Sequence, residues 1–236
     1  MKLLAFETAT EACSVALWID GEVRERFEVA PRRHAELSLP WADALLGEAG
    51  VARSQLDALA VSRGPGAFTG VRLGISLVQG IALALDRPVV ALSTLAVLAA
   101  GVAAPDDVER HVLASIDARM GEVYAGKFAV RDGDVRALDQ ETVGPAAALE
   151  LPDDDIQWHG MGTGFAAGDG ALAVRLGSRL AQVDAAALPH AADLARLAAR
   201  AAARGELLAP ERIEPAYLRN QVALTLAEQQ ASRARR

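Results

Sequence analysis

The chain has 236 residues, of which 52% are hydrophobic and only 4% aromatic, so its core must be built mainly from Ala, Val, Leu and Ile. This length suffices for one large domain or two small ones with sizeable cores. The formal net charge of −7 argues against stand-alone binding of nucleic acid, because Lys and Arg supply most of the affinity for phosphates.

The single cysteine, Cys13, excludes a disulfide framework and a cysteine-based zinc site within one chain. The first residues form an apolar strand pattern, without the basic-then-apolar layout of a signal peptide. Every apolar run of about 18 residues is interrupted by charge or glycine, so no membrane span is expected. Together these features favour a cytoplasmic protein in a reducing compartment.

The first half of the chain predicts the order βββαβαβα. A three-stranded meander that leads into two right-handed βα crossovers favours a mixed sheet with helices on both faces. The Asp20-Gly21 turn joins the second and third strands, and Pro88 stops the longest helix. Strands are expected at 2–7, 12–19, 22–29, 56–61 and 89–92, and helices at 34–48, 68–85 and 94–100.

The second half restarts with strands and suggests a structural duplication. We expect an N-terminal half at 1–102, a smaller C-terminal half at 103–222 and a polar, frayed tail at 223–236. A linker at 101–108 separates the two halves. Strands are expected at 112–117, 122–130, 135–143 and 156–159, then a glycine cluster at 160–164 and a helix at 191–204.

A glycine-rich loop between an apolar strand and the longest helix is the first candidate site. Gly64 and Gly66 permit close backbone approach, and Pro65 stiffens the loop between them. Such a loop at a helix N-terminus can offer backbone N–H groups to an anion. A tight turn without any ligand is the alternative reading of the same pattern.

Two predicted helices carry more apolar surface than one sheet can cover. The apolar arc of the 34–48 helix exceeds half its circumference, and the 68–85 helix is apolar on nearly all sides. An internal helix–helix contact could cover the excess, but we favour a protein–protein interface formed by both helices. The interface is predicted to include Leu37, Trp41, Leu45, Leu73, Leu77, Gly80 and Ile81.

The order of the elements is that of the actin-like ATPase and sugar-kinase superfamily. More narrowly, the segments 3–17, 63–74, 116–124 and 214–219 resemble the TsaB family in sequence and in order. These segments span most of the chain. The resemblance implies an α/β, actin-like (ribonuclease H-like) fold of two related halves, each with a mixed sheet that starts with a three-stranded meander.

The resemblance also implies a function. TsaB is a non-catalytic subunit of the bacterial machinery that makes threonylcarbamoyladenosine in tRNA. Its partner TsaD transfers threonylcarbamoyl to adenosine 37 of tRNAs reading codons that begin with A, and a small ATPase, TsaE, docks near the subunit junction. In the family, the two N-terminal-half helices pack as a four-helix bundle with TsaD or in a homodimer, and tRNA is expected to bind only through the complex.

The segments that correspond to phosphate loops depart from those of ATP-binding relatives. The first has Glu7 where the family usually has Asp, and Ala9 replaces a glycine that lets backbone reach a phosphate. In the second, Arg119 stands where active relatives have small residues, and it could instead pair with an adjacent acidic side chain. We therefore predict a degenerate nucleotide cleft comprising Glu7, Thr8, Asp117, Arg119 and Gly162.

A metal site is not expected. TsaD carries a His-x-x-x-His pair on a helix, and the corresponding residues here are Thr94 and Leu98. The four histidines of the chain are not spaced as metal ligands; they are His34, His111, His159 and His190. We predict no catalytic residue and no tightly bound cofactor, with metal and the ATP-derived substrate held by the partner subunit.

Two alternatives to a non-catalytic subunit remain open. One is an active small-molecule kinase or ATPase of the same superfamily, which would use Glu7 or Asp117 in phosphate chemistry. The other is a metal-dependent peptidase or acyltransferase that acts alone, which the missing histidine pair disfavours.

Overall fold

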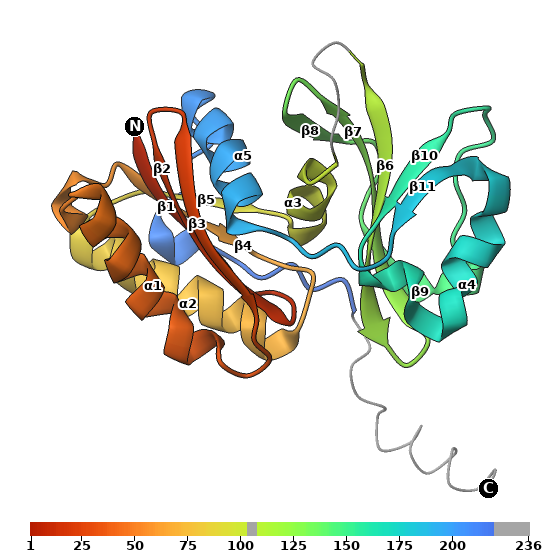
Figure 1. The fold of residues 1–236 in the computed structure, drawn as a ribbon, viewed down its shortest axis with the longest axis horizontal. Helices are drawn as coiled ribbons and strands as arrows, with labels where there is room; N and C mark the ends of the chain where they lie inside the picture. Colours follow the sequence, from red (N-terminus) through yellow and green to blue (C-terminus); the bar gives the residue numbers. More distant parts are fainter. Residues whose placement is uncertain (103–107, 220–236) are drawn as a thin grey trace, which may run out of the picture.

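The computed structural model describes residues 1–102 and 108–219, which form two mixed β-sheets side by side (Figure 1). The first sheet has the order β3-β2-β1-β4-β5. β1 pairs with β2 and β2 with β3 antiparallel, whereas β1, β4 and β5 are parallel. The strands are β1 (Lys2–Glu7), β2 (Ala12–Ile19), β3 (Glu22–Val29), β4 (Ala58–Ser62) and β5 (Val89–Leu92).

The second sheet has the order β11-β10-β6-β7-β8, and β9 also pairs with β7. β6, β10 and β11 run parallel, and the β6–β7 hairpin is antiparallel. The strands are β6 (Arg110–Arg119), β7 (Glu122–Arg131), β8 (Asp134–Ala137), β9 (Thr142–Pro145), β10 (Trp158–Met161) and β11 (Leu180–Asp184).

Helices cover both faces of the first sheet. α1 (His34–Ala49) and α2 (Phe68–Leu85) share one face, and α5 (Ala191–Ala203) lies on the other. α3 (Thr94–Ala100) contributes to the apolar clusters of both sheets, and α4 (Ala167–Leu176) packs on the second sheet. Short 3₁₀ helices occur at Arg53–Gln55, Ala146–Ala148, Thr163–Phe165, Gly177–Arg179 and Pro210–Arg212.

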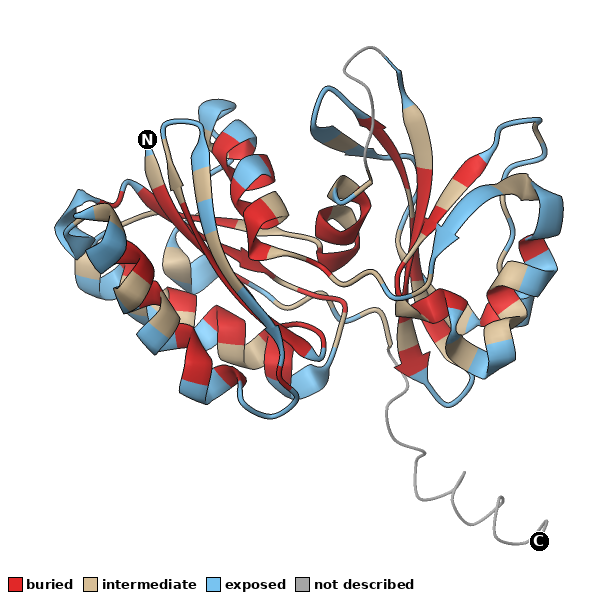
Figure 2. Cartoon of the chain, viewed as in Figure 1, coloured by how far each residue is buried: buried red, intermediate tan, exposed pale blue. Residues whose placement is uncertain are grey.

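β1 shows why the first sheet needs helices on both sides. Leu4 and Phe6 join the cluster under α1 and α2, while Leu3 and Ala5 join the cluster under α5. Successive side chains of a strand point to opposite faces, so a strand covered on both sides is apolar at every position. Figure 2 shows the resulting buried band through the centre of the sheet.

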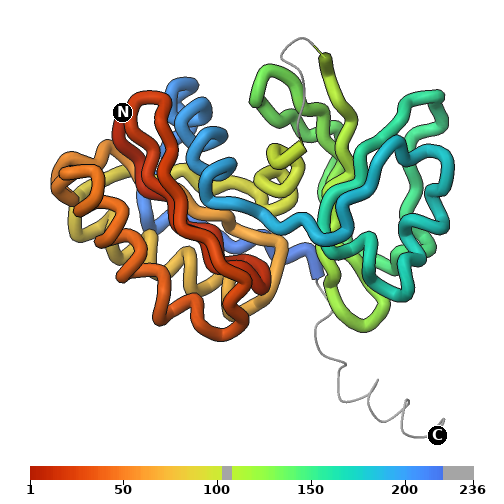
Figure 3. Tube along the Cα trace, viewed as in Figure 1, coloured from red at the N-terminus to blue at the C-terminus, as the bar shows by residue number. Residues whose placement is uncertain are grey.

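The chain crosses between the two sheets more than once (Figure 3). After β11 it returns to the first sheet and forms α5, although the sequence boundary at residue 102 placed this segment in the C-terminal half. It then runs back toward the second sheet, where Arg219 bonds to Glu122 and to the carbonyl oxygen of Ala118 at 3.2 Å. The two halves of the sequence therefore do not correspond to the two sheets, because α5 comes from the second half and packs on the first sheet.

The predicted order of the first half, βββαβαβα, is confirmed. In the second half, the single strand predicted at 135–143 is wrong, because the chain leaves the sheet edge and forms β8 and β9, which both pair with β7. α4 and β11 were not predicted. The first turn of α4 contains three residues with positive φ, Gly168, Asp169 and Gly170. The sequence therefore shows no regular helical pattern where α4 begins. The centre of the predicted linker and the predicted tail at 223–236 lie outside the described residues.

Candidate functional site

The glycine-rich loop and the start of α2 pack directly against the turn between β1 and β2. A Cβ added at Gly66 would lie 2.3 Å from the carbonyl oxygen of Ala9, and one at Gly70 would lie 2.1 Å from that of Thr8. At Gly74 the added Cβ would lie 2.6 Å from the Thr8 hydroxyl oxygen. The spacing of these glycines is therefore explained by backbone contact between two parts of the chain.

A backbone donor of this loop is already engaged. The N–H of Ala67, which precedes α2, donates to the carbonyl oxygen of Ala9 at 2.7 Å. The hydroxyl of Thr8 donates to the carbonyl oxygen of Gly70 at 2.8 Å. The loop that resembled an anion cradle is thus tied to the neighbouring turn through its own polar groups.

Glu7 is an internal carboxyl group with 0% exposure. Its Oε1 accepts from the N–H of Ala9 at 2.7 Å, and its Oε2 accepts from the hydroxyl of Ser62. Burial raises the pKa of Glu7 to about 7, and the hydrogen bonds from Ser62 and Ala9 oppose this shift. Thr8 is also buried, at 2% exposure, so both predicted cleft residues of the first sheet lie inside the protein.

The predicted cleft residues of the second sheet lie close together. The backbone N–H of Arg119 donates to Oδ1 of Asp117 at 2.7 Å, and its Nη1 lies 2.9 Å from Oδ2. The N–H of Asp117 donates to the hydroxyl of Thr163, the residue after Gly162, at 3.2 Å. Gly162 has φ +107°, and a Cβ there would lie 2.3 Å from the carbonyl oxygen of Ser115. Arg119 thus forms a local ion pair, and Gly162 serves close packing.

A polar cluster missed by sequence reasoning joins α5 to the edge of the first sheet. Oε1 of Glu25 accepts from the Ser14 hydroxyl at 2.7 Å and from the N–H of Ala192 at 3.0 Å, and Oε2 lies 3.0 Å from Nδ1 of His190. The ring of His190 stacks on Phe27 with centroids 4.1 Å apart. These residues are too far apart in sequence for any local pattern to connect them.

The carboxylate of Glu25 and the imidazole of His190 each shift the pKa of the other toward its charged form. Burial alone would raise the pKa of Glu25, but hydrogen bonds from His190, Ser14 and Ala192 hold it below its usual value. The hydrogen bond to Glu25 raises the pKa of His190. The cluster anchors the N-terminus of α5 on β2 and β3, a structural role.

The other histidines have separate environments. His34 is buried, and its Nε2 lies 3.0 Å and 3.1 Å from the carbonyl oxygens of Thr10 and Ala12. His111 and His159 line a hollow on the second sheet. In the part of the chain that the structure describes, no group of three or more His, Cys, Asp or Glu could hold a metal ion.

The structure corrects the predicted interface on α1. Leu37 and Leu45 are 9% and 2% exposed and belong to the core of this chain, so they offer little surface to a partner. Trp41 is partly exposed. Most of the wide apolar arc of α1 is therefore buried against the sheet of its own chain.

α2 keeps an apolar outer face. Val78 and Ala82 are fully buried against the sheet, whereas Leu73, Leu77 and Ile81 are partly exposed. The same outer side continues through the exposed residues Gly80, Leu83 and Ala84. We call Leu73, Leu77, Gly80, Ile81, Leu83 and Ala84 the outer face of α2.

Contrary to the sequence expectation, α2 is long and apolar enough, by length and composition alone, to cross a membrane. Core helices of soluble proteins pass the same test. The inner side of α2 packs on β1 and β4 in the core of the first sheet, so this finding is weak evidence for a span.

Comparison with known proteins identifies the family. Residues 27–226 match the family model described as TsaD, tRNA N6-adenosine threonylcarbamoyltransferase. The chain is 41% identical to the tRNA threonylcarbamoyladenosine biosynthesis protein TsaB of Escherichia coli, over 94% of this chain and 96% of that protein. The corresponding protein of Haemophilus influenzae is 37% identical over 94% and 95% of the two chains.

A solved structure agrees with these matches. YeaZ from Pseudomonas aeruginosa superposes with a TM-score of 0.83 at 46% identity, covering 92% of this chain and 99% of that one. The predicted actin-like α/β fold and the predicted family are both confirmed. On the evidence of its sequence, its two mixed sheets and these relatives, the chain belongs to the TsaB family.

Proposed function

We propose that this chain is a non-catalytic subunit in the biosynthesis of threonylcarbamoyladenosine in tRNA. It binds TsaD and supports transfer of threonylcarbamoyl to adenosine 37 of tRNAs reading codons that begin with A. TsaE joins the assembly, and tRNA is held by the complex. Family membership supports the pathway, because the relatives carry its name; the partners and the site of modification are part of the proposal.

The outer face of α2 is the observation that carries this proposal. Leu83 is 61% exposed and lies about one turn of α2 from the exposed Gly80, which in turn lies about one turn from the partly exposed Leu77. Apolar residues that a helix leaves accessible on its outer face are typical of an interaction surface. A Cβ at Gly80 would meet nothing within 4 Å, so the backbone of a partner helix can approach closely there.

A partner helix packed on this face would bury Leu73 and Leu77, in keeping with the helix bundle with TsaD that the family resemblance implies. In the absence of TsaD, a second copy of the chain could occupy the same face. Trp41 of α1 would lie at the margin of either contact. The proposed interface does not include Leu37 and Leu45, because both are buried in the core of this chain.

The absence of catalysis in this chain is supported by the state of its cleft residues. Glu7 and Thr8 are buried, and Asp117 is paired with Arg119. The buried side chains of Glu7 and Thr8 are not accessible to a nucleotide phosphate, and the Asp117 carboxylate already accepts from Arg119. We propose that TsaD holds the metal and the ATP-derived substrate, and that the complex is cytoplasmic.

Reconstitution tests the proposal. The chain is co-expressed with TsaD of the same organism, the complex is isolated, and modification of tRNA is measured with TsaD and TsaE in the presence and absence of the chain. We expect a stable complex and modification that requires the chain. Full modification without it, or no association with TsaD, would contradict the proposal.

A further inference from the structure

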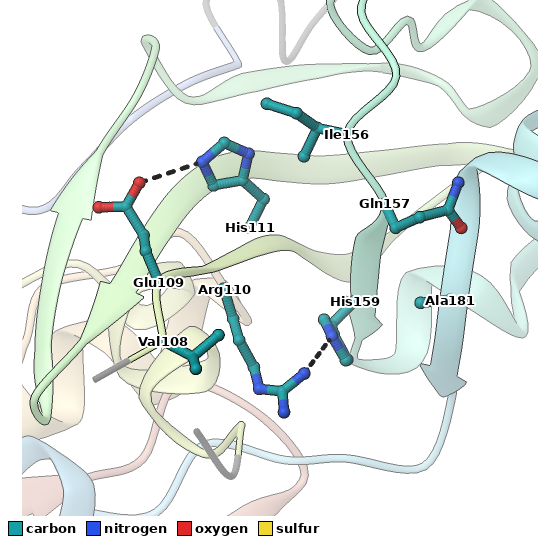
Figure 4. A pocket seen from close by; sticks show the side chains of 8 residues that line it. All are labelled: Val108, Glu109, Arg110, His111, Ile156, Gln157, His159 and Ala181. Carbon is teal, nitrogen blue, oxygen red and sulfur yellow. Dashed lines mark hydrogen bonds and ion pairs between the residues drawn. The ribbon is translucent and has the colours of Figure 1, made fainter. Parts of the chain in front are cut away.

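A hollow of about 430 Å³ opens at the end of the second sheet where β6 and β10 begin (Figure 4). Its volume lies in the range of small-molecule sites, about 300–1,000 Å³. α1 and α2 cover the other sheet, so this hollow is separate from the proposed interface (Figure 1). Its lining residues are Val108, Glu109, Arg110, His111, Ile156, Gln157, His159 and Ala181.

Arg110 is a partly buried cation in the wall of this hollow. Its Nη1 lies 3.0 Å from Nε2 of His159, and the two side chains point toward one another in Figure 4. Burial, together with the guanidinium of Arg110, lowers the pKa of His159, so this imidazole is neutral near pH 7 and accepts the hydrogen bond. The hydrogen bond to His159 therefore gives the Arg110 guanidinium an acceptor but no negative partner.

Within residues 1–102 and 108–219, Arg110 has no carboxylate at ion-pair distance, and its buried Nε has no hydrogen-bond partner. Removing a charged donor from water without an acceptor is unfavourable. The buried Nε is not accessible from the hollow, but an anion there could pair with the same guanidinium through its outer Nη groups.

The neighbouring acidic group is already engaged. Oε1 of Glu109 lies 3.3 Å from Nε2 of His111, and Oε2 lies 3.4 Å from Nη2 of Arg136. His111 also has a buried Nδ1 without a partner among the described residues. Among the described residues, the carboxylate of this wall is therefore paired, whereas the guanidinium of Arg110 is not paired with a carboxylate, which favours an anionic ligand.

The rim of the hollow also carries apolar surface. Val108 and Ile156 are 44% and 38% exposed. A bare anion would leave both side chains in water and would fill little of the volume. A ligand with one anionic group and a flat, weakly polar body would match both features.

We propose that this hollow binds a phosphate monoester of mononucleotide size, with its phosphate held by Arg110 and its base against Val108 and Ile156. The planar fork of a guanidinium can bind phosphate oxygens through two parallel hydrogen bonds. Nothing in this assignment depends on TsaD, so its success or failure is independent of the proposed function.

The test uses adenosine monophosphate as the probe. Isotope-labelled protein is titrated, and the backbone amide of Gln157 and the imidazole of His159 are followed by NMR. We expect saturable shifts at both residues. Adenosine, which lacks the phosphate, and inorganic phosphate, which lacks the nucleoside, should each bind at least about tenfold more weakly, since the proposed site contacts both parts.

Variants locate the binding. Arg110→Gln should weaken binding by about tenfold or more, and Arg110→Lys should weaken it less, because it keeps the charge but loses the fork. Arg53→Gln removes the same charge from an exposed ion pair with Asp43 in the first half, and should leave the affinity unchanged. Thermal unfolding of each variant confirms that it is folded.

Three results would overturn the proposal. The first is no saturation up to about 10 mM adenosine monophosphate, which is weaker than millimolar binding. The second is equal loss of affinity in Arg110→Gln and Arg53→Gln, which would indicate a general charge effect. The third is inorganic phosphate or adenosine binding as tightly as the nucleotide.

Discussion

The hydroxyl of Thr8 donates a hydrogen bond of 2.8 Å to the carbonyl oxygen of Gly70, 62 residues further along the chain. This bond joins the turn after β1 to the first turn of α2. A Cβ at Gly70 would collide with the carbonyl oxygen of Thr8, so the contact requires glycine. The motif that most resembles a phosphate loop therefore serves to seat α2 on the sheet.

Substitution of Gly70 by Ala should destabilise the protein. The added methyl group would lie 2.1 Å from the carbonyl oxygen of Thr8, a backbone atom that cannot rotate away. Overpacking of this kind costs about 1–3 kcal/mol in the free energy of unfolding. Urea unfolding followed by circular dichroism measures the change.

Gly80→Ala is the matched control in the same helix. Nothing lies within 4 Å of its added Cβ, and alanine favours a helix over glycine by about 0.8–1.0 kcal/mol. The unfolding free energy of the isolated chain should therefore rise by about that amount. If both variants shift the unfolding free energy in the same direction, close packing does not explain why glycine is needed at position 70.

The buried carboxyl of Glu7 should make stability depend on pH. Its pKa is about 7 in the folded protein and 4.5 as a model value, so the folded state binds more protons between these two values. Stability is then highest below about pH 4.5 and falls as pH rises to about 7, by about 3 kcal/mol from this group. Glu7→Gln resembles the protonated form, because the Ser62 hydroxyl can accept from the new amide.

Glu7→Gln should match the unsubstituted protein near pH 5 and exceed it in unfolding free energy near pH 8. Urea unfolding at both pH values measures this difference. His190, whose pKa is raised by Glu25, contributes stability that is also lost as pH rises, so His190→Gln serves to separate the two groups. Parallel pH curves for Glu7→Gln and the unsubstituted protein would exclude Glu7 as a source of the dependence.

Leu77→Asp should prevent association with TsaD while leaving the isolated chain folded. Leu77 is partly exposed on the outer face of α2, so the carboxylate stays hydrated in the free chain but would be buried without a partner charge in a complex. Size-exclusion chromatography of the mixed subunits measures association. Val174→Asp is the control, because Val174 is 80% exposed on α4, a helix that packs on the second sheet and not beside α2.

An unchanged elution profile for Leu77→Asp would place the interface elsewhere. An equal loss with Val174→Asp would indicate a general effect of added charge. In the absence of TsaD, the same pair of variants should show whether any homodimer uses the outer face of α2.

ATP should not bind to the degenerate nucleotide cleft of the isolated chain. Glu7 and Thr8 are buried, and the side chain of Arg119 is tied to Asp117. Isothermal titration calorimetry with ATP and magnesium should show no saturable heat. Saturable binding that is lost in Asp117→Asn would revive the active-kinase alternative, which assigns Asp117 to phosphate chemistry.

Local patterns were sufficient to predict much of the fold. Alternating and continuous apolar runs, the Asp20-Gly21 turn and Pro88 predicted the elements of the first half, because strand and helix periodicities are local properties. The same reasoning failed at β8 and β9, where sheet-edge geometry breaks the strand, and at α4, where three left-handed residues hide the helix start.

The candidate sites depended more on long-range contacts. The sequence by itself determined that α2 has more apolar surface than one sheet needs and that the phosphate loops are atypical. It did not show that Leu45 faces inward, that Glu7 bonds to Ser62, or that Arg110 meets His159. Only the tertiary structure decided these points, because burial and the partner of a charged group depend on which distant strands and helices pack together.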